Sequence, residues 1–186
     1  MEKQYKPRAP KAPKPLKPIT EFATAILARR EHSTTELRRK LTTKGYPKPE
    51  IADLITQLLE KNYLNDVRYA EARARTRAHH SKWGEGRIKQ ELAQNGVAKE
   101  TTQATLAELS ETEDWLATAT KLLQRKFSKP LPDVSGLDPA LKKDALKELQ
   151  QEKSRRLNFL VRRGFSFTQA IKALGLSQDD LDDSFE

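Results

Sequence analysis

The chain has 186 residues, of which 33% are charged and 36% hydrophobic, and its 35 Lys and Arg against 26 Asp and Glu leave a formal net charge of +9. Because there is no cysteine, disulfides, thiolate nucleophiles and cysteine-containing metal sites are excluded, and no apolar run predicts a membrane span or a signal peptide. We therefore expect a soluble, cytoplasmic protein, whose basic charge fits either a polyanionic partner or an inert solvated surface.

The two ends of the chain carry opposite charge. Residues 1–18 hold six Lys and Arg, one Glu and five of the ten prolines, which predicts a basic, extended and disordered tail. Residues 177–186 hold five acids and no basic residue, and they predict a frayed acidic tail without calcium-loop spacing. Because the tails cancel, residues 19–176, with 29 Lys and Arg and 20 Asp and Glu, carry the whole net charge.

The body begins with three predicted helices. The first covers about residues 20–31. Ser33 lies three residues before Glu36, the spacing of a capping box, and predicts a helix that ends at Gly45. Apolar residues from Ile51 to Leu59 then recur at helical spacing, in a helix whose first turn accommodates Pro49.

Further helices follow to the end of the body. Residues 66–80 are helical in pattern, and an apolar stripe runs from Trp115 to Phe127 within a helical segment at about 112–127. After a loop at 128–137, Asp138 and Pro139 open a long helix that ends near Gly164. Nothing alternates as a strand would, so the predicted fold class is all-α.

Three segments of the body align on Gly45, Gly96 and Gly164, each with an apolar residue four positions before the glycine and another just after it. A helix follows each segment and another precedes it, which predicts an elongated array of three tandem three-helix repeats. The predicted organisation is a basic tail at 1–18, repeat one at 19–64, repeat two at 65–110, repeat three at 111–176 with an extended linker at 128–150, and an acidic tail at 177–186.

Catalysis finds no support in the sequence. His79 and His80 are neighbours and would point about 100° apart on a helix, and His32 lies by a helix start, so no metal site is predicted. The segment 84–86, Gly-Glu-Gly, follows no strand and predicts a cap turn rather than a phosphate loop. We expect that the protein is not an enzyme and that it binds no cofactor and no metal.

Cations occur in all three repeats, and we predict that they form a binding surface, since guanidinium groups suit bidentate contacts to carboxylate or phosphate. Glu71 and Arg75 lie one helical turn apart, as do Arg73 and Arg77, so part of this charge is expected to pair internally. The predicted binding residues are Arg29, Arg30, Arg38, Arg39, Lys40, Lys44, Arg68, Arg73, Arg75, Arg77, Arg87, Lys89, Arg155, Arg156, Arg162 and Arg163.

Aromatic side chains that would stack on bases are few. Tyr46, Tyr63, Tyr69, Phe159 and Phe165 are all predicted to lie in the core or between helices. Sequence-specific RNA recognition, which needs exposed aromatic rings, is therefore not expected.

Several motifs together resemble the RecX family of bacterial regulatory proteins. They are STTELRRKL at 33–41 followed by Lys44-Gly45-Tyr46, YLNDVRYA at 63–70, GEGRIKQEL at 84–92 followed by Gly96-Val97, and KSRRLNFLVRRGF at 153–165. The likeness runs in order from about residue 20 to residue 176. The chain departs from the family pattern at Asn65, where aspartate is usual, and at residues 128–150, which exceed the usual linker.

The resemblance implies an elongated array of three-helix repeats that binds the RecA recombinase, mainly as a filament on DNA, and inhibits it. Such proteins lie in the groove of the filament and block its extension, ATP turnover, strand exchange and LexA co-cleavage. From this we expect RecA and the RecA–DNA filament as partners, direct contact with single- or double-stranded DNA, and a monomer.

Two alternatives remain open. One is a helix-turn-helix-like protein that binds DNA without RecA, and the other is a helical adaptor for an acidic partner. Under the RecA hypothesis, changing Arg38, Arg39, Arg75 and Arg77 to Glu should weaken filament binding.

Overall fold

The computed structural model describes residues 16–176, so the predicted tails at 1–18 and 177–186 lie outside the described residues except for residues 16–18. Within this range the structure contains nine α-helices and no strand, which confirms the all-α prediction. The helices are α1 (Ile19–Leu27), α2 (Thr34–Lys44), α3 (Lys48–Glu60), α4 (Asp66–His79), α5 (Glu85–Gln94), α6 (Lys99–Thr112), α7 (Trp115–Lys126), α8 (Pro139–Arg162) and α9 (Phe167–Ala173).

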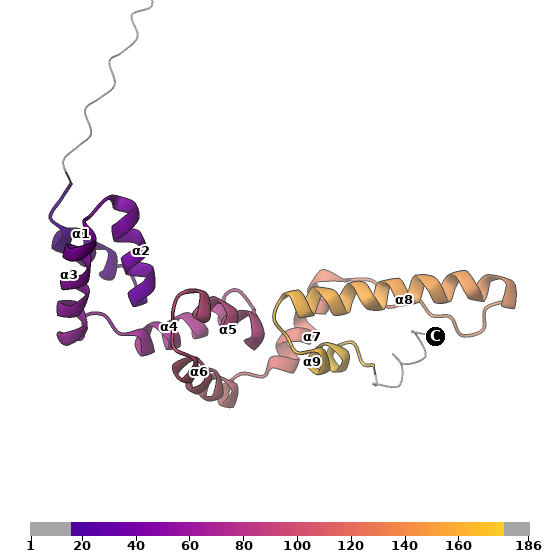
Figure 1. The fold of residues 1–186 in the computed structure, drawn as a ribbon. Coiled ribbons are helices and arrows are strands. Elements are labelled where there is room, and N and C mark those ends of the chain that lie inside the picture. Colours follow the sequence, from indigo (N-terminus) through magenta and orange to yellow (C-terminus); the bar gives the residue numbers. More distant parts are fainter. Residues whose placement is uncertain (1–15, 177–186) are drawn as a thin grey trace, which may run out of the picture.

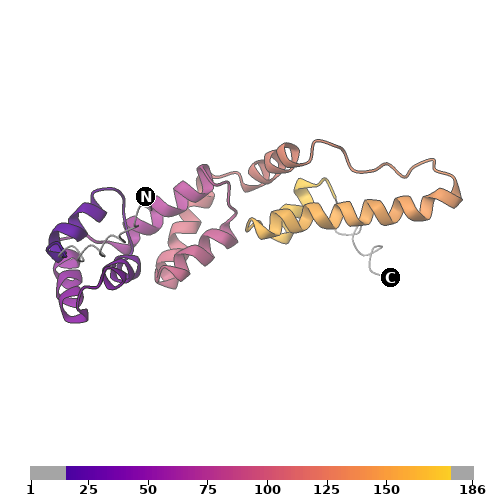
Figure 2. The same ribbon diagram turned by 90° about the horizontal axis from the view of Figure 1, so that it is seen from above.

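The helices pack in three successive groups of three, which confirms an elongated array of tandem repeats (Figures 1 and 2). Helices α1, α2 and α3 contact one another, as do α4, α5 and α6, and then α7, α8 and α9. We refer to these groups as repeats one, two and three. Between residues 16 and 176, no helix combines the length and apolar character needed to cross a bilayer.

Local signals in repeat one act largely as predicted. The Ser33 hydroxyl accepts a hydrogen bond from the Glu36 amide at 3.0 Å, and Gly45 ends α2 with a left-handed φ of 101°. The Glu36 side chain does not complete a capping box, because it pairs with cations instead. Leu59, in the last turn of α3, is 45% exposed, so the apolar face of this helix is shorter than its sequence pattern.

Across residues 16–176, two hydrophobic cores stabilise the array rather than three. Repeat one has its own core, whereas repeats two and three share a single larger one. Trp115 of α7 and Leu160 of α8 belong to the same cluster as Ile88 of α5 and Leu106 of α6. The second and third repeats therefore form one packed unit.

Polar contacts join repeat one to repeat two. The Ser33 hydroxyl donates to the Asn95 carbonyl at 2.7 Å, and the Thr34 amide donates to the Asp66 carboxylate at 2.7 Å. Asn65 caps α4 by accepting from the Val67 amide at 2.9 Å, so the departure from the family pattern preserves the cap.

Backbone contacts between glycines join repeat two to repeat three. The Gly84 amide donates to the Arg163 carbonyl at 2.8 Å, and the Gly86 amide donates to the Gly164 carbonyl at 2.9 Å. A Cβ added at Gly84 would lie 2.4 Å from the Gly164 carbonyl carbon. Gly84 is the predicted cap of α5, but the close approach of two backbones, which no local pattern indicated, is what requires glycine at this position.

The linker before α8 and the turn after α3 differ in detail from what the sequence predicts. Residues 128–138 contain no helix and run beside α8, whose first half comprises residues 139–150 (Figure 2). Tyr63 is 65% exposed, so its predicted place in the core or between helices is wrong. It lies in the turn after α3, where Asn62 has a φ of 55° and the next residue, Leu64, is the one buried.

Candidate functional site

The predicted cations fall into two groups in the structure. One group pairs with carboxylates of the same chain: Arg30, Lys40, Arg68, Arg73, Arg75, Arg77, Arg155 and Arg156. The other group has no carboxylate partner among residues 16–176: Arg29, Arg38, Arg39, Lys44, Arg87, Lys89, Arg162 and Arg163. Only the second group offers charge that is wholly available to a partner.

A buried carboxylate, that of Glu36 in the first turn of α2, organises the first cluster of cations. Glu36 accepts two hydrogen bonds from Arg30, at 2.9 and 2.5 Å, and lies 3.5 Å from the Lys40 ammonium. Burial alone would raise the pKa of the Glu36 carboxyl, but the Arg30 hydrogen bonds and the nearby cations lower it to about 2. His32 is buried beside it, and burial lowers the pKa of its imidazole. Arg30 and Lys40 therefore stabilise the repeat.

Glu91 of α5 organises the second cluster, in repeat two. Arg73 and Arg77 of α4 both donate to its carboxylate, each through Nη2 at 2.6 Å. Burial would raise the pKa of the Glu91 carboxyl, but the Arg77 and Arg73 hydrogen bonds outweigh it and lower that pKa. The one-turn spacing of the two arginines thus serves to clamp α4 to α5.

The indole ring of Trp83 contacts two of the predicted arginines. The guanidinium carbons of Arg77 and Arg87 lie 4.3 and 4.0 Å from the centroid of its ring. Cation–π contact holds both side chains in place. Arg87 nevertheless stays exposed and has no carboxylate partner among residues 16–176; its guanidinium donates a 3.4 Å hydrogen bond to the Arg162 carbonyl.

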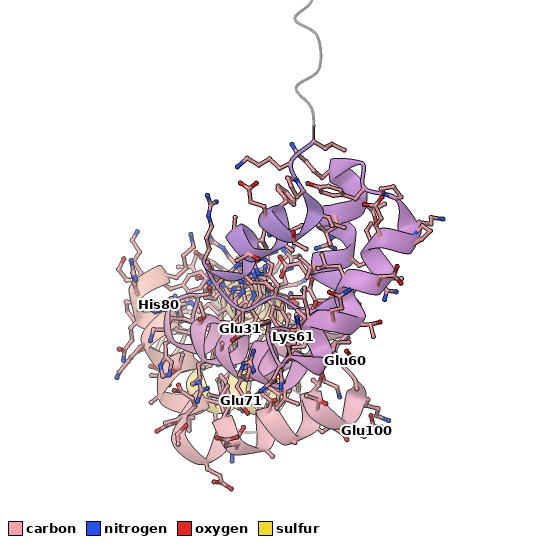
Figure 3. All side chains as sticks on the ribbon, turned by 90° about the vertical axis from the view of Figure 1, so that its left-hand side faces the viewer. Glu31, Glu60, Lys61, Glu71, His80 and Glu100 are labelled. Atoms are coloured by element: carbon pink, nitrogen blue, oxygen red, sulfur yellow. The ribbon has the colours of Figure 1, made fainter. Side chains whose placement is uncertain are left out.

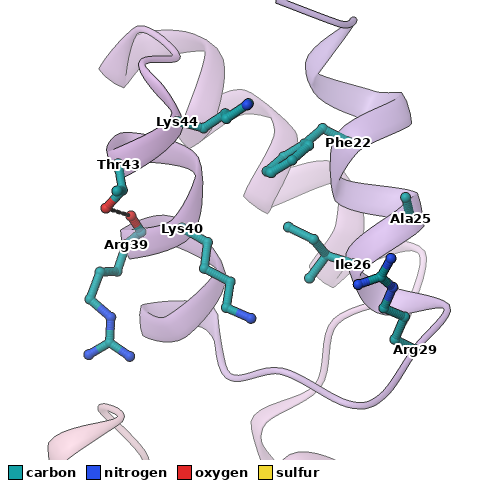
Figure 4. Close-up of a pocket in the computed structure, with 8 residues that line it drawn as sticks. All are labelled: Phe22, Ala25, Ile26, Arg29, Arg39, Lys40, Thr43 and Lys44. Atoms are coloured by element: carbon teal, nitrogen blue, oxygen red, sulfur yellow. Dashed lines mark hydrogen bonds between the residues drawn. The ribbon is translucent and has the colours of Figure 1, made fainter.

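A groove between α1 and α2 is lined by three of the available cations of repeat one, Arg29, Arg39 and Lys44 (Figure 4). Its volume is about 510 Å³, and Phe22, Ala25 and Ile26 of α1 supply an apolar floor. Cations surround this floor, and Lys44 lies 5.7 Å from the centroid of the Phe22 ring. The rim residues are Arg29, Arg39, Lys40, Thr43 and Lys44.

A second cationic cavity, of about 350 Å³, lies where repeat two meets repeat three. Helices α5, α7 and α8 supply its walls, and no carboxylate lines it. Sequence reasoning missed Lys126, because its place in the cavity depends on how α7 packs against α8. The lining residues are Arg87, Lys126, Phe127, Arg155, Asn158, Phe159, Arg162 and Arg163.

Other predicted residues lie outside both depressions. Arg156 is 8% exposed and donates to Glu152 at 2.9 Å and to the Lys129 carbonyl at 2.7 Å, so it anchors the linker to α8. Arg68 pairs with Glu31 at 3.0 Å across the junction of repeats one and two. Lys89, Arg38 and Arg75 are exposed.

Neither depression contains histidine or an acidic side chain. Seen along the array, His80 and Glu100 project from opposite sides of repeat two (Figure 3). No three His, Asp or Glu side chains in the described stretch 16–176 are grouped to hold a metal ion. The arrangement offers charge and apolar surface for binding.

Comparison with known proteins identifies relatives over most of the chain. Residues 21–58 match the first three-helix domain of RecX, and residues 65–106 match its second three-helix domain. The chain is 35% identical over 160 residues to the regulatory protein RecX of Vibrio parahaemolyticus, covering 86% of this chain and 92% of the relative. It is 32% identical over 162 residues to the protein of the same name from Halorhodospira halophila, covering 87% and 89%.

Solved structures agree on the fold. The chain matches a crystal structure of regulatory protein RecX with a TM-score of 0.59 at 18% identity, covering 84% of this chain and 70% of the other. It matches the RecX structure from Lactobacillus salivarius with a TM-score of 0.58 at 19% identity, covering 88% and 96%.

Proposed function

The chain belongs to the RecX family of regulatory proteins, and we propose that it binds the RecA recombinase, above all as the filament that RecA forms on DNA. Binding limits filament growth, ATP turnover, strand exchange and LexA co-cleavage, and so moderates DNA repair and the SOS response. The protein acts in the cytoplasm as a monomer and as a regulator rather than an enzyme.

The shape of the molecule supports this proposal. An elongated array presents a long surface that can follow another helical assembly, and each repeat adds a modest contact to the total. A bound array that spans neighbouring RecA subunits blocks the addition of further subunits and hinders the rearrangements that accompany ATP turnover.

The groove of repeat one is the observation that carries the proposal. Its apolar floor and rim of four cations fit a protein surface in which an apolar side chain is flanked by carboxylates. A phosphate backbone offers no apolar group to pack against this floor, so we assign the groove to the protein component of the filament.

The structure changes which residues should be mutated. Arg77, one of the four residues chosen from the sequence, clamps α4 to Glu91, and its reversal would damage repeat two instead of testing a surface. Arg29, Arg39 and Lys44 line the groove, are exposed and have no carboxylate partner in the described part of the chain. The triple change Arg29→Glu, Arg39→Glu and Lys44→Glu therefore tests the groove.

The assay is DNA-dependent ATP hydrolysis by RecA at increasing concentrations of this protein. With three cations reversed, each worth up to about 1 kcal/mol, we expect half-inhibition to need roughly 10- to 100-fold more of the variant. A matched control changes Lys142, Lys143 and Lys147 to Glu, which alters the charge equally on the exposed first half of α8. If the groove variant inhibits as well as wild type, the groove is not the contact.

A pull-down on RecA-coated and bare single-stranded DNA distinguishes the alternatives. The proposal predicts stronger retention on the coated DNA than on bare DNA. Equal retention on both would support a DNA-binding protein that acts without RecA, and retention on neither would leave the adaptor for an acidic partner.

A further inference from the structure

The cationic cavity between repeats two and three is lined by one more cation than the groove of repeat one. Five of its eight lining residues are cations and none is acidic. Their charges come from three helices that are far apart in the sequence: Arg87 from α5, Lys126 from α7, and Arg155, Arg162 and Arg163 from α8 and its C-cap.

Intramolecular contacts orient these cations but leave their charge almost unneutralised. Arg163 donates to the Ser81 carbonyl at 3.1 Å and Arg87 stacks on Trp83, so both are held without meeting a carboxylate. Arg155 pairs with Glu152 at 3.3 Å. That guanidinium is exposed, so the pair contributes little.

Two cations of the cavity have no side-chain partner within residues 16–176. Both Lys126 and Arg162 are exposed, and neither side chain takes part in an ion pair, a hydrogen bond or a ring contact within the described residues. Like charges gathered in one depression repel, and an anion with several charges relieves that repulsion on binding.

The walls of the cavity are rigidly placed. Gly86 and Gly164 hold α5 against the end of α8 through a 2.9 Å backbone hydrogen bond, α7 contacts α8, and all three helices contribute residues to the shared core. The ligand therefore meets a preformed arrangement and does not have to order it.

We propose that this cavity binds the phosphodiester backbone of a single DNA strand. A polyphosphate chain supplies closely spaced charges that suit several guanidinium groups. A volume of about 350 Å³ admits part of one strand, whereas a duplex could present only one ridge of phosphates to it.

The two aromatic rings of the cavity lead to a further expectation about sequence preference. Phe127 and Phe159 pack edge to face with centroids 5.6 Å apart. Guanidinium groups already lie against both, since Arg156 is 5.1 Å from the Phe127 centroid and Arg163 is 5.5 Å from that of Phe159. Because both rings already contact guanidinium groups and each other, we expect the strand to be held through its backbone and without sequence preference.

This site is independent of the groove assigned to RecA, and its test contains no RecA. The full chain is titrated against a fluorescein-labelled thymidine oligonucleotide of about 30 residues, with anisotropy as the readout, at salt concentrations from about 50 to 200 mM. The test variant is Lys126→Gln with Arg162→Gln. The control is Lys142→Gln with Lys143→Gln, which removes the same charge from the exposed first half of α8.

We expect the test variant to bind roughly tenfold more weakly at about 50 mM salt, and the slope of log K against log salt to fall in magnitude by about 1.4, or about 0.7 for each phosphate that is no longer neutralised. The control should stay within about twofold of wild type at that salt concentration, because its cations lie away from the strand. Arg162→Lys with Lys126 intact, which keeps the charge, should leave the slope unchanged. The groove variant Arg29→Glu, Arg39→Glu and Lys44→Glu should retain strand binding even if it no longer inhibits RecA.

Three results would overturn the proposal. The first is a test variant that binds the oligonucleotide like wild type. The second is equal affinity for a duplex of the same length, which would refute the assignment to a single strand. The third is displacement of the strand by polyglutamate at equal charge concentration, which would assign the cavity to an acidic protein.

Discussion

Replacing Gly164 by alanine should strongly destabilise the unit formed by repeats two and three. Gly164 has a φ of 91°, and left-handed backbone costs an ordinary residue about 1–2 kcal/mol. The added Cβ would lie 2.3 Å from the Arg87 backbone nitrogen, and the shift needed to relieve such a clash costs about 1–3 kcal/mol. We therefore expect the variant to lose about 2–5 kcal/mol of unfolding free energy.

Two companion variants separate strain from clash. Gly136 has a φ of 77° and nothing within 4 Å of an added Cβ, so Gly136→Ala should lose only about 1–2 kcal/mol, the cost of the left-handed backbone. Gly84 has a φ of −79°, and Gly84→Ala should show only the clash with the Gly164–Phe165 backbone, without the cost of a left-handed conformation. Urea unfolding followed by tryptophan fluorescence is the assay, since Trp83 and Trp115 both pack in the shared core. A Gly164→Ala variant no less stable than Gly136→Ala would refute the reasoning.

Two carboxylates give further predictions. Because the pKa of Glu36 is about 2 in the folded protein, below its ordinary 4.5, its stabilisation is complete above pH 4.5 and is lost as the pH falls towards 2. Glu36→Gln should therefore lower the free energy of unfolding by up to about 3 kcal/mol at neutral pH. Measured by circular dichroism, the difference in stability between variant and wild type should disappear in acid. Glu91→Gln should lower the free energy of unfolding by about 2–4 kcal/mol, because it releases Arg73 and Arg77. Glu71→Gln breaks an exposed pair and should lower it by less than about 1 kcal/mol. Equal losses in urea unfolding would contradict the clamp of α4 on α5.

Much of the fold was predictable because its signals are local. Ser33 and Asp138 cap helices, Gly45 ends one, and all three act through atoms within a few residues of themselves. The apolar spacing from Ile51 to Ile55 likewise reports a helix before anything packs on it. The predicted burial of Tyr63 was wrong because the turn places the side chain of the next residue, Leu64, in the core and leaves the aromatic ring exposed.

The sequence predicted that the candidate sites would be cationic, but not which cations would line them. The sequence shows which residues are cationic, and the pairing of Glu71 with Arg75 could be anticipated from their spacing. Whether Arg77 is free or bound to Glu91 depends on the packing of α4 on α5. The inclusion of Lys126 in a cavity with Arg162 depends on the packing of three helices.

By itself the sequence determined the helical class, the threefold repeat, the family resemblance and a net charge of +9 that equals the charge of the repeats, because the two tails cancel. Only the tertiary structure decided where that charge is available. Internal carboxylates neutralise the cations they contact. Six of the eight predicted binding cations that have no carboxylate partner in residues 16–176 line either a groove in repeat one or the cavity at the junction of repeats two and three, and Arg38 and Lys89 lie outside both. The reason is physical, since helical periodicity is written in neighbouring residues, whereas electrostatic neutralisation depends on distances between side chains that only packing brings together.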